Sequence, residues 1–229
     1  MPPILRNASA ALLLGLGLQT SLPAHAGQPS TFTGRPVDFA VYATQTRSSW
    51  NSDDRTYDVR VDEVGFRWIE RFSNGIGAGL RLGYSGISDN GRPELAGISQ
   101  NGGHLGLVVN AVPLQAGAFS LTTLMDATYR MTSGSNSQRK VENDWATLTA
   151  GLSGHLRMNS VRLSLGADYQ VVSGTERISG DINSTRHFSA DQPLTGTAGI
   201  DLLVGGGRIG LHGETGGRNS YSLTFSRDF

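Results

Sequence analysis

Several segments of this chain alternate apolar with polar side chains, and arginines and carboxylates recur in the middle of the polar faces. Charged groups that converge in a narrow, partly dry interior are costly unless they pair with one another. We therefore predict an internal network of ion pairs, in preference to a pore lining or an active site. The predicted network comprises Arg67, Arg81, Asp126, Arg130, Asp168, Asp201 and Glu214.

A second group of residues could perform nucleophilic chemistry. His187 and Ser189 flank Phe188, and Asp201 follows Ser189 by twelve residues. A histidine can remove the proton of a serine while a carboxylate orients the imidazole. This H-x-S pair resembles the catalytic arrangement of the outer-membrane lipid A deacylase family, which implies attack of the serine on an ester. The pair is predicted to lie in a polar loop before Pro193, and an ion-pair role for Asp201 is preferred.

The sequence lacks the motifs of several other kinds of active or binding site. Outer-membrane proteases of the omptin type rely on an Asp-x-His pair, whereas this chain has Asp53-Asp54 and no Asp-x-His. The sequence contains no P-loop, no G-x-S-x-G motif and no His/Cys cluster. Because it also contains no cysteine, disulfides and thiol chemistry are excluded. We predict neither a metal nor a cofactor.

Residues 1–26 have the features of a secretory signal peptide. Arg6 supplies a positive charge, residues 8–18 are apolar, and Ala24-His25-Ala26 forms a cleavage site before Gly27. Its removal takes one arginine and no acid from 19 Lys+Arg and 19 Asp+Glu, which leaves a net charge of −1. This balance gives no electrostatic reason to expect a nucleic-acid partner. We assign residues 27–34 to a periplasmic lead-in and residues 35–229 to one β-barrel domain.

The mature chain contains ten segments that alternate with a period of two residues. In residues 119–129, for example, the odd positions form an apolar face and the even positions a polar one. Each segment approaches the ~9–11 residues that a tilted membrane strand requires. The count of ten depends on a turn at residues 205–207, and eight strands is the alternative.

The connections between these segments alternate in length. Short links are expected near residues 71–75, 113–117, 157–160 and 205–207. Long polar links are expected near residues 47–56, 86–102, 132–144 and 173–192, and a fifth outer link, at residues 216–219, is short. Short periplasmic turns and longer external loops are typical of outer-membrane barrels. We predict an all-β fold, a closed antiparallel up-and-down transmembrane β-barrel with both termini in the periplasm.

One segment changes phase along its length. Its apolar residues are odd-numbered from Tyr57 to Val61 but even-numbered from Val64 to Trp68. A slip of one residue sends a whole face to the wrong side, so a β-bulge is expected near Asp62-Glu63. Alternatively, residues 57–61 project above the membrane, where facing matters less.

The last nine residues alternate and end on an aromatic side chain. Tyr221, Leu223, Phe225 and Phe229 occupy the apolar positions, although Arg227 interrupts them. This pattern resembles the closing strand of bacterial outer-membrane β-barrels, and the whole mature chain resembles small barrels of the OmpA and OmpX kind. The resemblance implies recognition by the barrel-assembly machinery, a bacterial outer-membrane location, contact with lipid and lipopolysaccharide, and a monomer.

Function is less well determined by the sequence. The favoured hypothesis is a structural or surface-interaction barrel with a charge-filled lumen, which is not an enzyme. A narrow channel for small solutes is the alternative, followed by a deacylase-like esterase.

Overall fold

A computed structural model describes residues 37–228 except 53–54, 73–74, 90–91 and 93–94. The predicted signal peptide, the lead-in and Phe229 lie outside the described residues. Within the described part, no helix is long and apolar enough to cross a membrane. The strands are β1 (Val37–Ser52), β2 (Arg55–Arg71), β3 (Ile76–Asp89), β4 (Gln100–Ala116), β5 (Phe119–Ser135), β6 (Arg139–Met158), β7 (Val161–Gly180), β8 (Ser184–Ala190), β9 (Leu194–Val204), β10 (Gly207–Gly216) and β11 (Arg218–Asp228).

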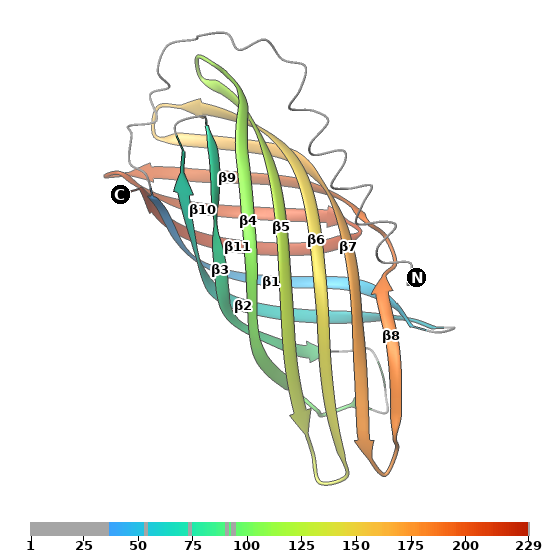
Figure 1. Cartoon of the computed structure of the whole chain (residues 1–229). Helices are drawn as coiled ribbons and strands as arrows, with labels where there is room; N and C mark the ends of the chain where they lie inside the picture. The colour runs from blue at the N-terminus through green and yellow to red at the C-terminus, as the bar shows by residue number, and fades with distance from the viewer. Residues whose placement is uncertain (1–36, 53–54, 73–74, 90–91, 93–94, 229) are drawn as a thin grey trace.

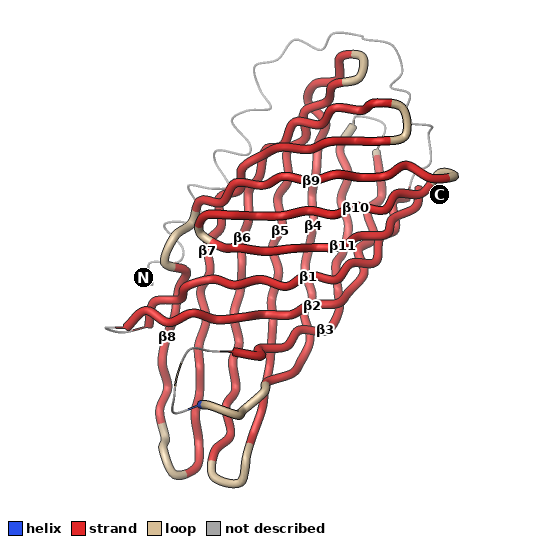
Figure 2. The backbone as a smooth tube through the Cα atoms, turned by 180° about the vertical axis from the view of Figure 1, so that it is seen from behind, coloured by secondary structure: helices blue, strands red, loops and turns tan. Residues whose placement is uncertain are grey.

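The strands form a closed antiparallel ring (Figures 1 and 2). Strands β1 to β7 pair consecutively, β7 pairs with β9, and β9 to β11 pair consecutively. The pairing of β11 with β1, from Asp38 opposite Asp228 to Ser48 opposite Arg218, closes the ring. A closed ring leaves no unpaired sheet edge. The predicted up-and-down barrel is confirmed, with eleven strands instead of ten because β8 is additional to the ten that complete the ring.

The two ends of the barrel differ. The inner end carries Val37, Asp228 and the short turns that follow β2, β4, β6 and β9. In the last of these turns, Gly205 and Gly206 have φ angles of 56° and 85°, which suit a two-residue hairpin turn that requires positive φ at both positions. The turn predicted to separate the segments before and after residues 205–207 is therefore present.

The outer end is built mostly of strand where the sequence predicted loops. β5 and β6 remain paired up to Ser135 opposite Lys140, and β7 continues to Gly180. The predicted loops at residues 132–144 and 173–192 are therefore wrong over most of their length. Polar side chains obscured these strands, because their outward faces lack the apolar alternation on which the prediction of strands rested. The β5–β6 and β7–β8 hairpins extend furthest in this direction (Figure 1).

Strand β8 narrows the outer end. It pairs with β7 from Ser173 opposite Ser189 and with β1 from Trp50 opposite Ala190, beyond the outer limits of β9 to β11. At this level β8 stands in place of three strands, so the ring has eight strands where it has ten nearer the inner end. Because barrel diameter grows with strand number, the outer part is narrow enough for side chains to fill.

Strand β2 keeps a single phase. Its pairing with β1 continues through Asp62-Glu63 without a shift, so the predicted bulge there is wrong. The register shift of this region lies between β2 and β3 at Arg60/Val61, where β3 contributes the extra residue Ser88. Val59 and Val61 face inward at the outer end, whereas Phe66 and the other even-numbered apolar residues face outward. The apparent change of phase therefore marks a change of environment.

Candidate functional site: the interior of the barrel

Inward-facing side chains form charged clusters in the wider part of the barrel and apolar clusters in the narrow outer part. The largest charged group, here called the central cluster, is contributed by strands β1 to β5. It comprises Tyr42, Glu63, Arg81, His104, Asp126 and Arg130, all of which are less than about one quarter exposed.

Two arginines neutralise the carboxylates of the central cluster. Arg81 donates from Nη1 to Asp126 Oδ2 at 3.0 Å, and its Nη2 lies 3.6 Å from Glu63 Oε2. Arg130 donates from Nε to Glu63 Oε1 at 2.5 Å and from Nη1 to Thr147 at 2.8 Å. Buried charges are tolerated when they are paired and hydrogen-bonded in this way.

A chain of hydrogen bonds runs through His104. The hydroxyl of Ser85 donates to Glu63 Oε1 at 3.1 Å and lies 2.7 Å from His104 Nδ1. His104 Nε2 lies 2.5 Å from the hydroxyl of Tyr42, which accepts a bond from Arg81 Nε at 3.2 Å. These directions assign the proton of a neutral His104 to Nδ1. Ser85 and His104 are fully buried, so this serine–histidine pair has no access to a substrate.

Two smaller groups lie on β7 and β9 to β11. Asp168 and Glu214 both bind Arg218, at 3.1 Å and 2.5 Å, and Ser220 donates to Glu214 at 2.6 Å. Asp201 accepts from Arg162 at 2.8 Å and lies 3.1 Å from His212 Nε2. Across the described residues, no group of three or more potential ligands is arranged to hold a metal ion.

A further charged group, the inner cluster, lies at the inner end. Asp38 is 2 % exposed and contacts three arginines. Arg71 lies 3.2 Å from Asp38, Arg67 lies 3.9 Å away, and Arg208 forms the shortest of the three contacts. Asp228 binds the same Arg71 at 3.6 Å, which joins the last strand to β1 and β2.

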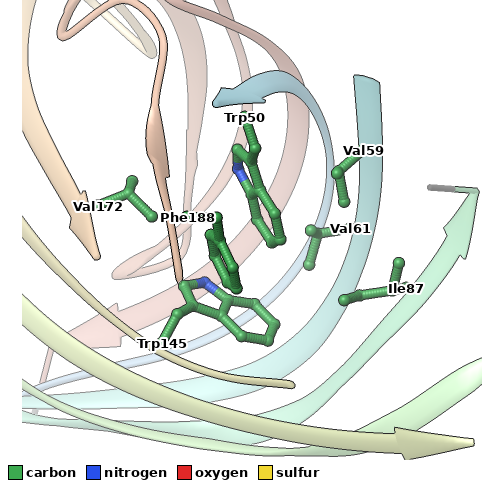
Figure 3. Packing of buried hydrophobic residues seen from close by; sticks show 7 residues of the cluster. All are labelled: Trp50, Val59, Val61, Ile87, Trp145, Val172 and Phe188. Carbon is green, nitrogen blue, oxygen red and sulfur yellow. The ribbon is translucent and has the colours of Figure 1, made fainter. Parts of the chain in front are cut away.

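The outer part of the barrel is filled by an aromatic plug (Figure 3). Trp50 stacks on Phe188 with ring centroids 4.3 Å apart, and the edge of Trp145 lies against Trp50 at 5.5 Å. These rings come from β1, β8 and β6, and aliphatic side chains from β2, β3 and β7 complete the layer. The plug comprises Trp50, Val59, Val61, Ile87, Trp145, Val172 and Phe188, each at most 7 % exposed.

A second apolar layer lies beyond the plug. Leu95 and Ile98, in the link between β3 and β4, pack against Val141 and Ile178. Beside them, Arg92 forms a bidentate ion pair with Glu176, so the link is bound into the barrel end by both apolar and charged contacts. The outer opening is thus covered twice.

Between the plug and the inner end lies a chamber of about 270 Å³. Hydroxyl-bearing residues of β1, β6 and β11 line one part of it, and members of the charged clusters line the rest. Its lining includes Trp50 and Trp145, which form its outer boundary.

The structure places all seven residues of the predicted network inside the barrel, but in separate groups. Arg81, Asp126 and Arg130 lie in the central cluster, whereas Arg67 lies in the inner cluster. Asp168 and Glu214 share Arg218, and Asp201 belongs to a fourth group. Sequence reasoning missed Glu63, whose inward position follows from the even-numbered outward face of β2. It also missed Asp38, which is inward by the alternation of β1.

The catalytic candidates are not brought together. His187 and Ser189 are exposed on the outer face of β8, and not in a loop as predicted, whereas Phe188 between them is buried in the plug. Asp201 faces the interior on β9 and is held by Arg162 and His212. His187 and Ser189 therefore lie outside the barrel and Asp201 lies inside it, so these three residues cannot form a catalytic triad.

Comparison with solved structures identifies the kind of barrel. The translocator domain of the autotransporter NalP from Neisseria meningitidis is 11 % identical, with 97 % of this chain and 98 % of that chain covered and a TM-score of 0.51. The outer membrane protease OmpT from Escherichia coli is 9 % identical over 88 % of this chain and 98 % of that chain, at a TM-score of 0.46. Neisserial surface protein A is 10 % identical, with 83 % of this chain and 97 % of that chain covered and a TM-score of 0.42.

These comparisons define a fold and not a function. No protein-family model and no curated protein sequence matches the chain. The likeness to the NalP translocator domain shows that the chain has the fold of an outer-membrane β-barrel, without a specific subfamily.

Proposed function

We propose that this outer-membrane β-barrel resides in the bacterial outer membrane as a structural or surface-interaction protein whose lumen does not conduct. The premise of membrane residence is supported by the outward faces of the strands. Leu107, Leu165 and Leu223 are 61 %, 72 % and 41 % exposed, and every strand of the ten-stranded ring carries at least two such side chains. Soluble monomers seldom expose contiguous apolar surface on this scale, whereas a bilayer covers it.

The aromatic plug is the observation that carries the non-conducting role. Its rings and aliphatic side chains cross the narrow outer part of the barrel, and the second apolar layer lies above them. An ion would have to leave water to pass through either layer, which is strongly unfavourable. The paired charges beneath the plug supply no continuous surface of one sign.

The surface available to a partner lies on the outer hairpins. The tips of β5–β6 and β7–β8 are joined by Arg139, which donates to Asp181 at 2.6 Å and 2.9 Å. These hydrogen bonds hold the pKa of Asp181 below its usual range. We infer that lipopolysaccharide surrounds the barrel, that the barrel-assembly machinery inserts it after export directed by residues 1–26, and that it functions as a monomer.

Planar-bilayer recordings test the closed lumen. We expect no steady current from the wild type and a measurable conductance from a variant that combines Trp50→Ala/Trp145→Ala with Leu95→Ala/Ile98→Ala, because two of the three rings of the plug and both link residues of the second apolar layer would be lost. Trp68→Ala is the matched control, since Trp68 faces outward and is 43 % exposed. Steady conductance of the wild type would contradict the proposal and favour a narrow channel.

A further inference from the structure

The chamber beneath the aromatic plug has the composition of a binding site. Its volume is about 270 Å³. This is space for one small molecule of monosaccharide size. The chamber is broad because the ring has ten strands here, and it ends where β8 reduces the ring to eight.

One wall of the chamber consists of hydroxyl groups. Thr44 lies opposite Ser222 and Thr46 lies opposite Ser220 across the β1–β11 pairing, so four hydroxyl-bearing residues form a continuous patch. β1 and β11 stand across the ring from β6 and β5. From that side, β6 contributes two further threonines. The serines and threonines of the lining are Thr44, Thr46, Ser48, Thr147, Thr149, Ser220, Ser222 and Thr224.

The charges of the lining cancel. Four arginines and four carboxylates border the chamber, so its formal net charge is zero. They are Arg67, Arg81, Arg130, Arg218, Glu63, Asp126, Asp168 and Glu214. A site with this balance offers no electrostatic advantage to an anion or to a cation. It does offer many donors and acceptors to a neutral ligand whose groups can act as both.

Two guanidinium groups of the chamber lining have a fully buried nitrogen atom that makes no hydrogen bond. They are Arg218 Nη1 and Arg67 Nε. The Arg218 side chain is 11 % exposed and is fixed by Glu214 and Asp168 through its other nitrogens. Neither nitrogen is open to a water-sized atom, so these two arginines form part of the chamber wall, and the hydroxyl-bearing residues are the groups available to a ligand.

We propose that the chamber binds a neutral polyhydroxylated molecule of monosaccharide size. The hydroxyl patch hydrogen-bonds the ligand, and Trp50 and Trp145 border it on the outer side. Because the plug closes the outer end, the ligand enters from the inner end past Arg67. The Arg67 side chain is 35 % exposed and reaches Asp38 only at 3.9 Å, so it can be displaced.

Tryptophan fluorescence provides a direct test. The chain has three tryptophans, and in a Trp68→Phe background the signal arises from Trp50 and Trp145 alone. The protein, folded in a detergent without a sugar headgroup, is titrated with glucose and myo-inositol as neutral probes, and with glucuronate and glucosamine as charged ones. We expect a saturable change at millimolar concentrations of the neutral probes and at least tenfold weaker binding of both charged probes.

The double variant Thr46→Val/Ser222→Ala should weaken binding of the neutral probe at least tenfold while the barrel remains folded on unboiled gels. Thr123→Val is the control, because Thr123 lies on the outward face of β5 and should leave binding unchanged. Binding that the double variant leaves unaltered would overturn the proposal. So would the absence of a saturable change in the wild type, or tighter binding of either charged probe.

Discussion

Glu63 shows how single residues sustain the interior. Its carboxylate forms an ion pair with Arg130, lies near Arg81 and accepts a hydrogen bond from the hydroxyl of Ser85. One acid therefore connects strands β2, β3 and β5. Each partner has a second contact of its own. The loss of one member therefore leaves a charge buried without compensation, which costs more than the pair contributes.

Arg81→Ala tests this dependence. Asp126 would lose its 3.0 Å ion pair and keep only the hydrogen bond from Thr128. We expect the free energy of unfolding in detergent to fall by ~3–5 kcal/mol, the range for breaking a buried pair. Equilibrium unfolding in urea measures the change.

The control for this variant is Arg177→Ala. Arg177 also forms an ion pair, with Asp144 at 2.7 Å, but its side chain is 55 % exposed at the outer end. Exposed pairs are worth ~0–1 kcal/mol, so little change is expected. Equal effects of the two substitutions would show that Arg81 is merely solvated.

Strand β8 has only seven residues but determines the shape of the outer end of the barrel. It completes the eight-stranded outer ring and contributes Phe188 to the aromatic plug. Its exposed side carries polar residues, so nothing in its composition indicates a membrane strand. This explains why sequence patterning assigned it to a loop.

Phe188→Ala tests the contribution of β8 to the closed end. Removal of a buried phenylalanine from a packed core typically costs ~3–5 kcal/mol, and here it also removes the ring stacked on Trp50. We expect a lower thermal midpoint in detergent and a change in the near-ultraviolet circular dichroism of the tryptophans. His187→Ala, on the exposed face of the same strand, should change the stability by only ~0.5 kcal/mol. A Phe188→Ala protein as stable as His187→Ala would rule out this role.

For the molecule as a whole, the sequence was sufficient to predict the fold and much less informative about the interior. Alternation in β5 and β7 predicted both faces correctly because lipid imposes an apolar outward side on membrane strands. No such constraint acts above the bilayer, where β2 and β6 turn apolar residues inward and polar residues outward. The pairing of the interior charges was also unpredictable, since it depends on which strands face one another across the ring.

Assembly of the whole barrel supplies a test in cells. Tyr221, Leu223 and Phe225 face outward, and Phe229 falls on the same alternate positions of the sequence, although Arg227 interrupts them. We expect deletion of Phe229 to lower the amount of heat-modifiable protein in the outer membrane, as measured on unboiled gels. Phe72→Ala is the matched control, since Phe72 is an exposed aromatic at the inner end that lies outside the last strand. Normal abundance after the deletion would show that Phe229 carries no assembly signal.

Because the strands differ in length, one side of the barrel extends further at the outer end (the high side) than the other (the low side). β6 and β7 have 20 residues each, whereas β9, β10 and β11 have 10 or 11, close to the minimum for crossing a bilayer. At ~3.3 Å per residue the difference is about 30 Å along a strand. An antibody or a bacteriophage approaching the cell would thus meet residues 136–139 and 181–183 first. The turn at Gly217 lies on the low side of the barrel and would be reached only after those tips.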